Sequence, residues 1–387
     1  MNAFTTSTRK LACVLLGVSA LATASPGNAD DGHSVLAPLK TITTLHSTVP
    51  PNGDVNPYGM AKIKNTIGNL RAGHILISNF NNSGNFQGEG TTIVDLAPDG
   101  SSFSVFATID VSQSSCPGGV GLTTALVVLD EGWVIVGSLP TTTQGTVFSG
   151  SGCLVVLDNM GKVVETFFGS LINGPWDMTA FERGHEAKLF VTNVLNGTVA
   201  GGGSVVPGGT VVRLNLKVSA STRPALESIT VIASGFPERT DPAALVIGPT
   251  GVALRANCDG DDCGDHDGDD HALLYVADTL SNRIAVIDHP LGRTTPTGIG
   301  RTLSQGGSLN APLGMVITPG GHLLTVNGGD GFVTEIAPDG KQVANFLLDN
   351  TGGPPPGAGT LFGLVFDPVH GVYFVDDGAN TLNLLHR

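Results

Sequence analysis

The strongest constraint on the fold is a pattern that recurs six times between residues 56 and 387. Each copy has an apolar stretch, a turn that contains glycine, a second apolar stretch and then a third. The second stretches align without gaps, and each closes on Asn, Ser or Asp, with successive closing residues 59, 55, 85, 49 and 49 positions apart. Their ranges are 75–79, 134–138, 189–193, 274–278, 323–327 and 372–376. A recurring unit of this length is typical of a repeat architecture.

The composition indicates that these stretches are β-strands. The chain has 54 glycines and only 13% charged residues, as expected for many short strands joined by tight turns. Residues 97–100 and 337–340 both read Ala-Pro-Asp-Gly, in which proline presets φ while Asp and Gly tolerate the reversal of the chain. We therefore expect an all-β, six-bladed β-propeller with four antiparallel strands per blade.

The last copy of the pattern ends at Arg387 after only three strands. Residues 38–48, which precede the first complete copy, carry Leu39, Ile42 and Leu45 and can supply the missing strand. Pairing of one chain end with the other would close the ring and remove two exposed sheet edges.

The N-terminus has the layout of a secretory signal peptide: Arg9 and Lys10, an apolar run over 11–24, then small residues through Ala29. We expect a signal over 1–29 and a single domain over 30–387, with an acidic insertion loop at 255–272. No later stretch approaches the roughly 20 apolar residues of a transmembrane helix. The sequence thus predicts a periplasmic or secreted monomer without a transmembrane segment.

The chain is acidic, with a formal net charge of −14. Loss of the predicted signal removes two positive charges and makes the remainder more negative still. Nucleic acid and anionic lipid require clustered Lys and Arg. We therefore expect no nucleic-acid partner, and instead a small molecule, a sugar or a peptide.

Four cysteines follow the predicted signal: Cys116, Cys153, Cys258 and Cys263. In an oxidising compartment an even number favours two disulfides. Proximity in sequence favours Cys116 with Cys153 and Cys258 with Cys263, although four cysteines permit three connectivities.

Residues 274–284, Leu-Tyr-Val-Ala-Asp-Thr-Leu-Ser-Asn-Arg-Ile, resemble an NHL repeat. The whole pattern is also similar to that of the six-bladed SMP-30 and gluconolactonase group, which implies a fold but no particular reaction. Hydrolytic members of that group hold a divalent metal with acidic or amide residues in the segments that enter the innermost strands. The corresponding positions here are Tyr58, Trp176, Thr250, Leu313 and Phe362. None is a good ligand for a hard cation, and Asp177 is the only carboxylate nearby.

In a propeller, the loops that enter the first strands and those that leave the second strands open on one face. Aromatic and polar residues should therefore meet at the channel mouth as a small-ligand pocket. The expected ligand-binding residues are Tyr58, Trp176, Asp177, Phe362, Asn79, Asn193, Asp278, Asn327 and Asp376. The alternative is that the Asn and Asp side chains bond the backbone of their own loops.

Residues 258–271 contain seven aspartates in fourteen positions. Asp265, Asp267 and Asp269 alternate and could direct carboxylates at one Ca²⁺. The alternative is a solvated surface insertion tied by a small disulfide. Zinc or copper held by both cysteines and both histidines of this segment is a weaker alternative, because export favours the disulfide.

No Gly-x-Ser-x-Gly elbow, phosphate loop or His-Glu-x-x-His motif is present. We therefore expect a binding protein with no catalytic residues, which uses the channel mouth for a small molecule, sugar or peptide. The first alternative is a hydrolase or lyase of the SMP-30 and lactonase type, with Asp177 and Asp278 as acid or base. The second is a scaffold for protein interactions.

Overall fold

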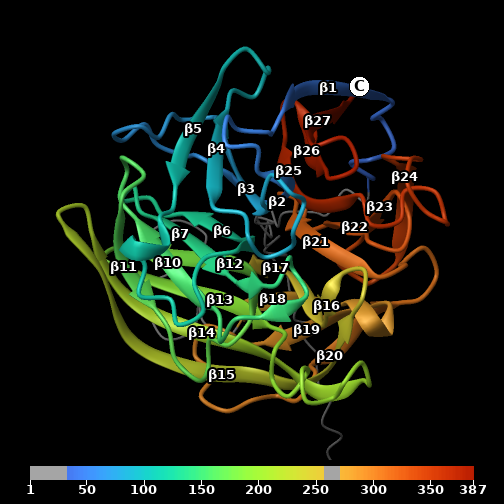
Figure 1. The fold of residues 1–387 in the computed structure, drawn as a ribbon. Coiled ribbons are helices and arrows are strands. Elements are labelled where there is room, and N and C mark those ends of the chain that lie inside the picture. Colours follow the sequence, from blue (N-terminus) through green and yellow to red (C-terminus); the bar gives the residue numbers. More distant parts are fainter. Residues whose placement is uncertain (1–32, 257–270) are drawn as a thin grey trace, which may run out of the picture. The chain divides into compact units, whose positions relative to one another are not determined.

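The computed structural model describes residues 33–256 and 271–387, and the described chain forms a ring of six β-sheet blades (Figure 1). Blade 1 is β2 (Val55–Lys62), β3 (Ile75–Asn81), β4 (Thr92–Leu96) and β5 (Phe103–Thr108); blade 2 is β6 (Leu122–Val128), β7 (Val134–Ser138), β10 (Cys153–Leu157) and β11 (Val163–Phe167). Blade 3 is β12 (Pro175–Arg183), β13 (Glu186–Asn193), β14 (Val206–Ser219) and β15 (Thr222–Asp241), with β16 (Leu245–Ile247) added at its edge. Blade 4 is β17 (Pro249–Arg255), β18 (Leu273–Asp278), β19 (Arg283–Asp288) and β20 (Arg301–Gln305). Blade 5 is β21 (Pro312–Ile317), β22 (Leu323–Asn327), β23 (Phe332–Ile336) and β24 (Gln342–Leu347).

Blade 6 confirms the predicted ring closure. It contains β25 (Leu361–Asp367), β26 (Gly371–Asp376) and β27 (Thr381–His386), and its fourth strand is β1 (Thr41–Ser47) from the other chain end. The β1–β27 pairing is antiparallel and runs from Thr41 opposite His386 to Ser47 opposite Thr381. The predicted six-bladed, four-stranded propeller is therefore confirmed.

The second strand of every blade is almost wholly buried. Neighbouring sheets pack against both of its faces, which explains why these strands are continuous apolar runs and do not alternate with polar residues. Tyr275, Phe190 and Tyr373 are among the largest side chains in these strands that are fully buried.

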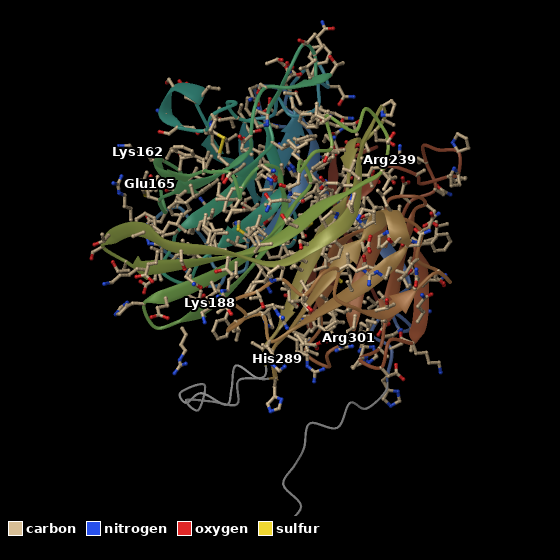
Figure 2. All side chains as sticks on the ribbon, turned by 90° about the horizontal axis from the view of Figure 1, so that it is seen from below. Lys162, Glu165, Lys188, Arg239, His289 and Arg301 are labelled. Atoms are coloured by element: carbon tan, nitrogen blue, oxygen red, sulfur yellow. A yellow bond between two sulfur atoms is a disulfide. The ribbon has the colours of Figure 1, made fainter. Side chains whose placement is uncertain are left out.

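Two faces of the ring are defined by the direction of the strands. We call the side where the chain enters each innermost strand, and where each second strand ends, the entry face. The other side, where the innermost strands end, is the exit face. In Figure 2, Arg239 lies toward the entry face, whereas His289 and Arg301 lie toward the exit face.

The loops that follow the second strands differ sharply between the two halves of the ring. In blades 1 to 3 they span 82–91, 139–152 and 194–205; the second contains a small hairpin, β8 (Thr141–Thr142) and β9 (Val147–Phe148). In blades 4 to 6 they span only four residues each, 279–282, 328–331 and 377–380. The first of these short loops is the 3₁₀ turn η4 (Thr279–Ser281). The long loops therefore gather over one half of the entry face.

The β14–β15 hairpin of blade 3 extends beyond its own blade to the outer edge of blade 2 (Figure 1). Trp133 Nε1 donates a hydrogen bond to the carbonyl of Ser219 near the tip of this hairpin, at 2.9 Å. Arg223 forms an ion pair with Glu165 on the outermost strand of blade 2, at 3.3 Å. These contacts fix the hairpin against its neighbour.

A disulfide joins Cys116 to Cys153, as the sequence predicts, with Cα atoms 5.5 Å apart. Cys116 lies in the segment between the 3₁₀ turn η1 (Val111–Gln113) and β6, and Cys153 begins β10. Cys258 and Cys263 lie outside the described residues. Among those described, no helix is long and apolar enough to cross a bilayer.

Candidate ligand-binding cavity

The aromatic residues predicted at the channel mouth do meet there, but they pack against one another. The Tyr58 ring is stacked on Phe80 at 4.6 Å between centroids and lies 4.0 Å from Phe362 and 6.2 Å from Trp176. We call these four residues the aromatic cluster; each is less than 10% exposed. Burial also raises the pKa of Tyr58 well above its usual range, with smaller effects from Asp377 and Asn56. The cluster closes the channel at the entry face.

The asparagine side chains at the ends of three second strands form hydrogen bonds with the segment that enters their own blade. Asn79 Nδ2 donates to the carbonyl of Thr48 at 3.2 Å, and Asn193 Oδ1 accepts from the amide of Gly174 at 3.3 Å. Asn327 makes two such bonds, to residues 308 and 310. All three side chains are fully buried. These residues therefore connect the entering loop to the second strand.

The two aspartates predicted at the same position differ. Asp278 is fully buried and accepts hydrogen bonds from Arg283 Nη2 at 2.8 Å and Nε at 3.0 Å. Asp376 accepts a hydrogen bond from the amide of Ala379, and burial, with the neighbouring Asp349, raises its pKa. Its neighbour Asp377 has a pKa raised to about 7 by burial and by Asp376.

Asp177 lies inside the channel, on the other side of the aromatic cluster from the entry face. It lines a cavity of about 280 Å³ formed by the innermost strands, with Lys62 and Glu182 near its exit-face end. The carboxylate accepts hydrogen bonds from the amides of Met178 at 2.8 Å and Val252 at 3.1 Å. Burial raises the pKa of Asp177 to about 7, and these two bonds offset the effect only in part.

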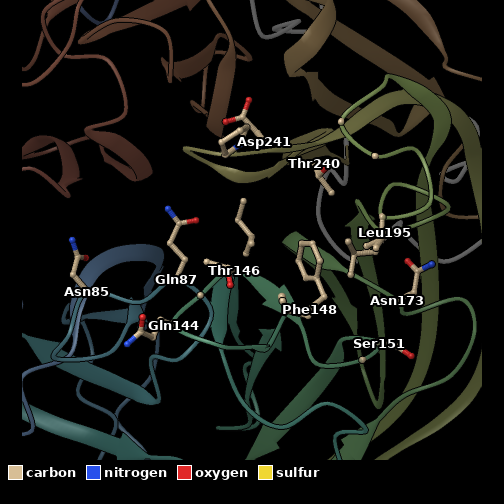
Figure 3. Close-up of a pocket in the computed structure, with 18 residues that line it drawn as sticks. Asn85, Gln87, Gln144, Thr146, Phe148, Ser151, Asn173, Leu195, Thr240 and Asp241 are labelled. Atoms are coloured by element: carbon tan, nitrogen blue, oxygen red, sulfur yellow. The ribbon is translucent and has the colours of Figure 1, made fainter.

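A separate cavity of about 1130 Å³ lies on the entry face (Figure 3). Its walls are the long loops of blades 1, 2 and 3, together with Asn173 ahead of β12 and residues 240–245, which join β15 to β16 at the edge of blade 3. Its apolar lining includes Phe148, Leu195 and Leu245; Leu245 belongs to the same apolar core as the aromatic cluster, and Phe148 and Leu195 pack against that core. The cluster therefore supports the base of this entry-face cavity.

The polar part of the entry-face cavity is almost entirely neutral. It consists of side-chain amides and hydroxyls, contributed by Asn85, Gln87, Gln144, Asn173, Thr146, Ser151 and Thr240. Among the described residues that line the cavity, Asp241 is the only charged one. It forms a 2.7 Å ion pair with Arg239 and accepts hydrogen bonds from the backbone amides of Ala243 and Ala244. Asn173 Nδ2 donates to Asn196, while the buried Asn173 Oδ1 has no protein partner within the described part of the chain. The cavity thus offers hydrogen bonds but little net charge.

Glu238, close to this wall in sequence, is a fully buried carboxyl. Its Oε1 accepts from Thr198 Oγ1, in the blade 3 loop, and burial raises its pKa to about 7 although this hydrogen bond opposes the shift. Its Oε2 has no partner among the described residues. A carboxyl of this kind retains a proton up to neutral pH.

None of the nine predicted residues lines the entry-face cavity. The structure brings Tyr58, Trp176 and Phe362 together beneath it, places Asp177 in the channel, and leaves the five strand-end residues in their own blades. The lining comes from long loops that share no repeat pattern. The signal that could have located it is the distance between second and third strands, which is long in three consecutive copies only.

The channel mouth does not suit the divalent metal that the family resemblance implies. At the five positions that correspond to the metal ligands, four side chains are aromatic or apolar, and the hydroxyl of the fifth, Thr250, already bonds Thr279 and the carbonyl of Pro312. Across residues 33–256 and 271–387, no group of three or more His, Cys, Asp or Glu residues is arranged to hold a metal ion. The proposed calcium ligands Asp265, Asp267 and Asp269 lie outside these residues.

No protein-family profile matches the chain, and no curated protein matches it either. Solved structures do: a gluconolactonase from Xanthomonas campestris superposes with a TM-score of 0.55 at 14% identity, over 92% of each chain. Regucalcin from Agrobacterium tumefaciens, described as a calcium-binding protein, superposes with a TM-score of 0.54 at 14% identity, over 90% of this chain and 94% of that one. The chain is therefore a six-bladed β-propeller with the fold of the gluconolactonase and regucalcin group.

Proposed function

We propose that the protein binds a neutral, polyhydroxylated small molecule, such as a sugar or its lactone, in the entry-face cavity. The observation that carries the proposal is the chemistry of the lining: neutral amides and hydroxyls around one phenyl ring, with the single charge paired. Amides and hydroxyls can each donate and accept, so they match the hydroxyl groups of a sugar. The Phe148 side chain offers an apolar face for the carbon skeleton.

The size and rigidity of the site support the same proposal. A cavity of about 1130 Å³ exceeds the usual range of roughly 300–1,000 Å³ for small-ligand sites and leaves room for ordered water or a disaccharide. Gln87 spans from the blade 1 loop to the carbonyl of Ala243 at 2.7 Å, which holds two of the walls at a fixed separation.

The test is a calorimetric screen of neutral sugars and lactones against the protein and two variants. Phe148→Ala and Gln87→Ala should weaken binding of any hit by about tenfold, because each removes a contact of the lining. Phe168→Ala is the matched control, since Phe168 is 50% exposed, directly follows the last strand of blade 2 and is not among the residues that line the cavity. Affinity that is unchanged in both cavity variants would refute the proposal.

A second candidate is a hydrolase or lyase that acts on such a ligand. The fold shared with a gluconolactonase favours this class, and Glu238, whose pKa burial raises to about 7, is a candidate proton donor. Hydrolysis of a lactone releases an acid, so the same screen, followed with a pH indicator, separates the two functions. Acid release from a lactone above the spontaneous rate supports the enzyme, and binding of a lactone without acid release supports the binding protein.

A further inference from the structure

A second site is indicated by a departure from the repeat along the channel wall. In blades 1, 4, 5 and 6 the third residue of the segment that enters the innermost strand is glycine: Gly59, Gly251, Gly314 and Gly363. Three of them have no room for a side chain, because a Cβ at Gly251, Gly314 or Gly363 would lie 1.9 to 2.3 Å from a carbonyl oxygen of the next blade. Blade 2 has Ala125 at this position, and blade 3 has Asp177. Asp177 is therefore the one carboxylate at this position among the six blades.

Most of the side chains that line the cavity around Asp177 are aliphatic. Of the five methionines in the chain, three lie in its wall: Met60, Met178 and Met315. The other aliphatic lining residues come from the same innermost strands of all six blades. Thioethers are polarisable and adapt to irregular ligands, which explains their use at binding surfaces.

The carboxylate of Asp177 has no cationic partner. Its hydrogen bonds come from the amides of Met178 and Val252, and no ion pair within the described part of the chain includes it. The other charged groups of this lining are Lys62, Lys64 and Glu182 at the exit-face end. Lys62 pairs with Asp367, and Lys64 pairs with Asp130 at 2.9 Å. The positive charges at the opening are therefore already compensated.

A carboxylate in an apolar cavity is unfavourable unless a positive charge or several donors accompany it. We propose that the channel cavity binds a small organic cation, whose ammonium group lies against the Asp177 carboxylate and whose apolar part lies between the methionine side chains. The volume of about 280 Å³ accommodates an amine with a short alkyl chain. This site is separate from the entry-face cavity, because the aromatic cluster lies between the two.

The raised pKa of Asp177 supports this site and provides a second readout. At neutral pH part of the protein carries a protonated Asp177, and a bound ammonium favours the ionised form. Binding should therefore release a fraction of a proton, which calorimetry detects as a dependence of the heat on the buffer.

The test uses three probes of similar size and different charge: n-butylammonium, n-butanol and n-butyrate. We expect n-butylammonium to bind at millimolar concentration, and the neutral and anionic probes to bind at least about tenfold more weakly. Asp177→Asn and Asp177→Gly should each reduce the affinity for n-butylammonium by at least about tenfold. Asp177→Gly introduces the residue that four other blades carry, so a folded variant is available if the amide is not tolerated.

Asp241→Asn is the matched control, because it removes a carboxylate from the entry-face cavity and should leave amine binding unchanged. The absence of any heat with n-butylammonium, equal binding of the three probes, or full affinity in both Asp177 variants would overturn the proposal. None of these outcomes bears on sugar binding at the entry face, so the two proposals fail separately.

Discussion

The surroundings of individual carboxyl groups in this protein shift their pKa values in opposite directions. Asp367 is buried, yet hydrogen bonds from Lys62 and from the amides of residues 369 and 370 hold its pKa far below the usual range. Glu238 and Asp177 are surrounded by protein without a cation, so their pKa values rise to about 7. The difference follows from the partner, because the Lys62 cation stabilises the ionised form of Asp367, whereas the donors of Glu238 and Asp177 do not offset their burial.

Glu238 should make the stability of the fold depend on pH. Its pKa is higher in the folded chain, at about 7, than its ordinary value of 4.5. The folded state therefore keeps a proton that the unfolded state has lost, and the free energy of unfolding falls as the pH rises from about 4.5 to about 7. We expect Glu238→Gln to remove on the order of 1–3 kcal/mol of this decrease.

The measurement is urea unfolding at about pH 5 and about pH 8. The wild-type protein should lose more stability between the two values than Glu238→Gln does. Asp177 and Asp377 titrate in both proteins, so the comparison isolates Glu238. If the free energy of unfolding depended on pH identically in the two proteins, the proposed contribution of buried Glu238 would be contradicted.

At the scale of elements, the segment that begins the described chain is held by one buried acid. The carboxylate of Glu335, in β23, accepts hydrogen bonds from the backbone amides of Val35 at 2.9 Å and Leu36 at 3.0 Å. It also forms hydrogen bonds with the Ser34 hydroxyl and with His322. Leu36 and Leu39 are buried beside it. The segment thus connects blade 5 to β1, which completes blade 6.

Deletion of residues 34–47 should therefore lower the free energy of unfolding by at least about 5 kcal/mol. Two buried leucines account for about 3–6 kcal/mol, and loss of the partners of Glu335 leaves a buried carboxylate less satisfied. Ile42→Ala in β1 is the control, because Ile42 is 37% exposed and its loss should cost less than about 1 kcal/mol. Urea unfolding measures the stability of both variants. Equal stability of the truncated and full chains would contradict the role of this segment in closing the ring.

The strands could be predicted from the sequence and the binding surface could not. The second strands were predictable because each must pack on both faces, so burial imposes an apolar run on every copy; β7 and β22 match the expected ranges residue for residue. The loops 82–91, 139–152 and 194–205 face no such constraint and differ in each blade. Glu238 was missed because nothing in the local sequence reveals that it is buried beside Thr198.

The aromatic residues show how far a prediction from topology extends. The ring places Tyr58, Trp176 and Phe362 at one point, as the sequence indicates, because each begins an innermost strand. Whether they line a pocket or fill it depends on side-chain packing, and here Phe80 completes a closed cluster. Topology determines which residues meet, while the volume of the side chains determines what space remains.

At the scale of the whole ring, the asymmetry between long and short loops makes the site. Six similar blades alone would give a symmetrical face, whereas long loops on three consecutive blades form walls and the short loops opposite do not. Segments as distant in sequence as residue 85 and residue 245 line one cavity. Function on a repeat fold then resides in the loops, and the blades supply the rigid support.

Hydrogen–deuterium exchange with and without a bound sugar tests this arrangement most directly. With the ligand bound, amides in 82–91, 139–152, 194–205 and 240–245 should exchange more slowly together, while the short loops 279–282, 328–331 and 377–380 should not change. Protection confined to the short loops or to the exit face, or to one long loop alone, would contradict a ligand site built by the long loops of blades 1 to 3.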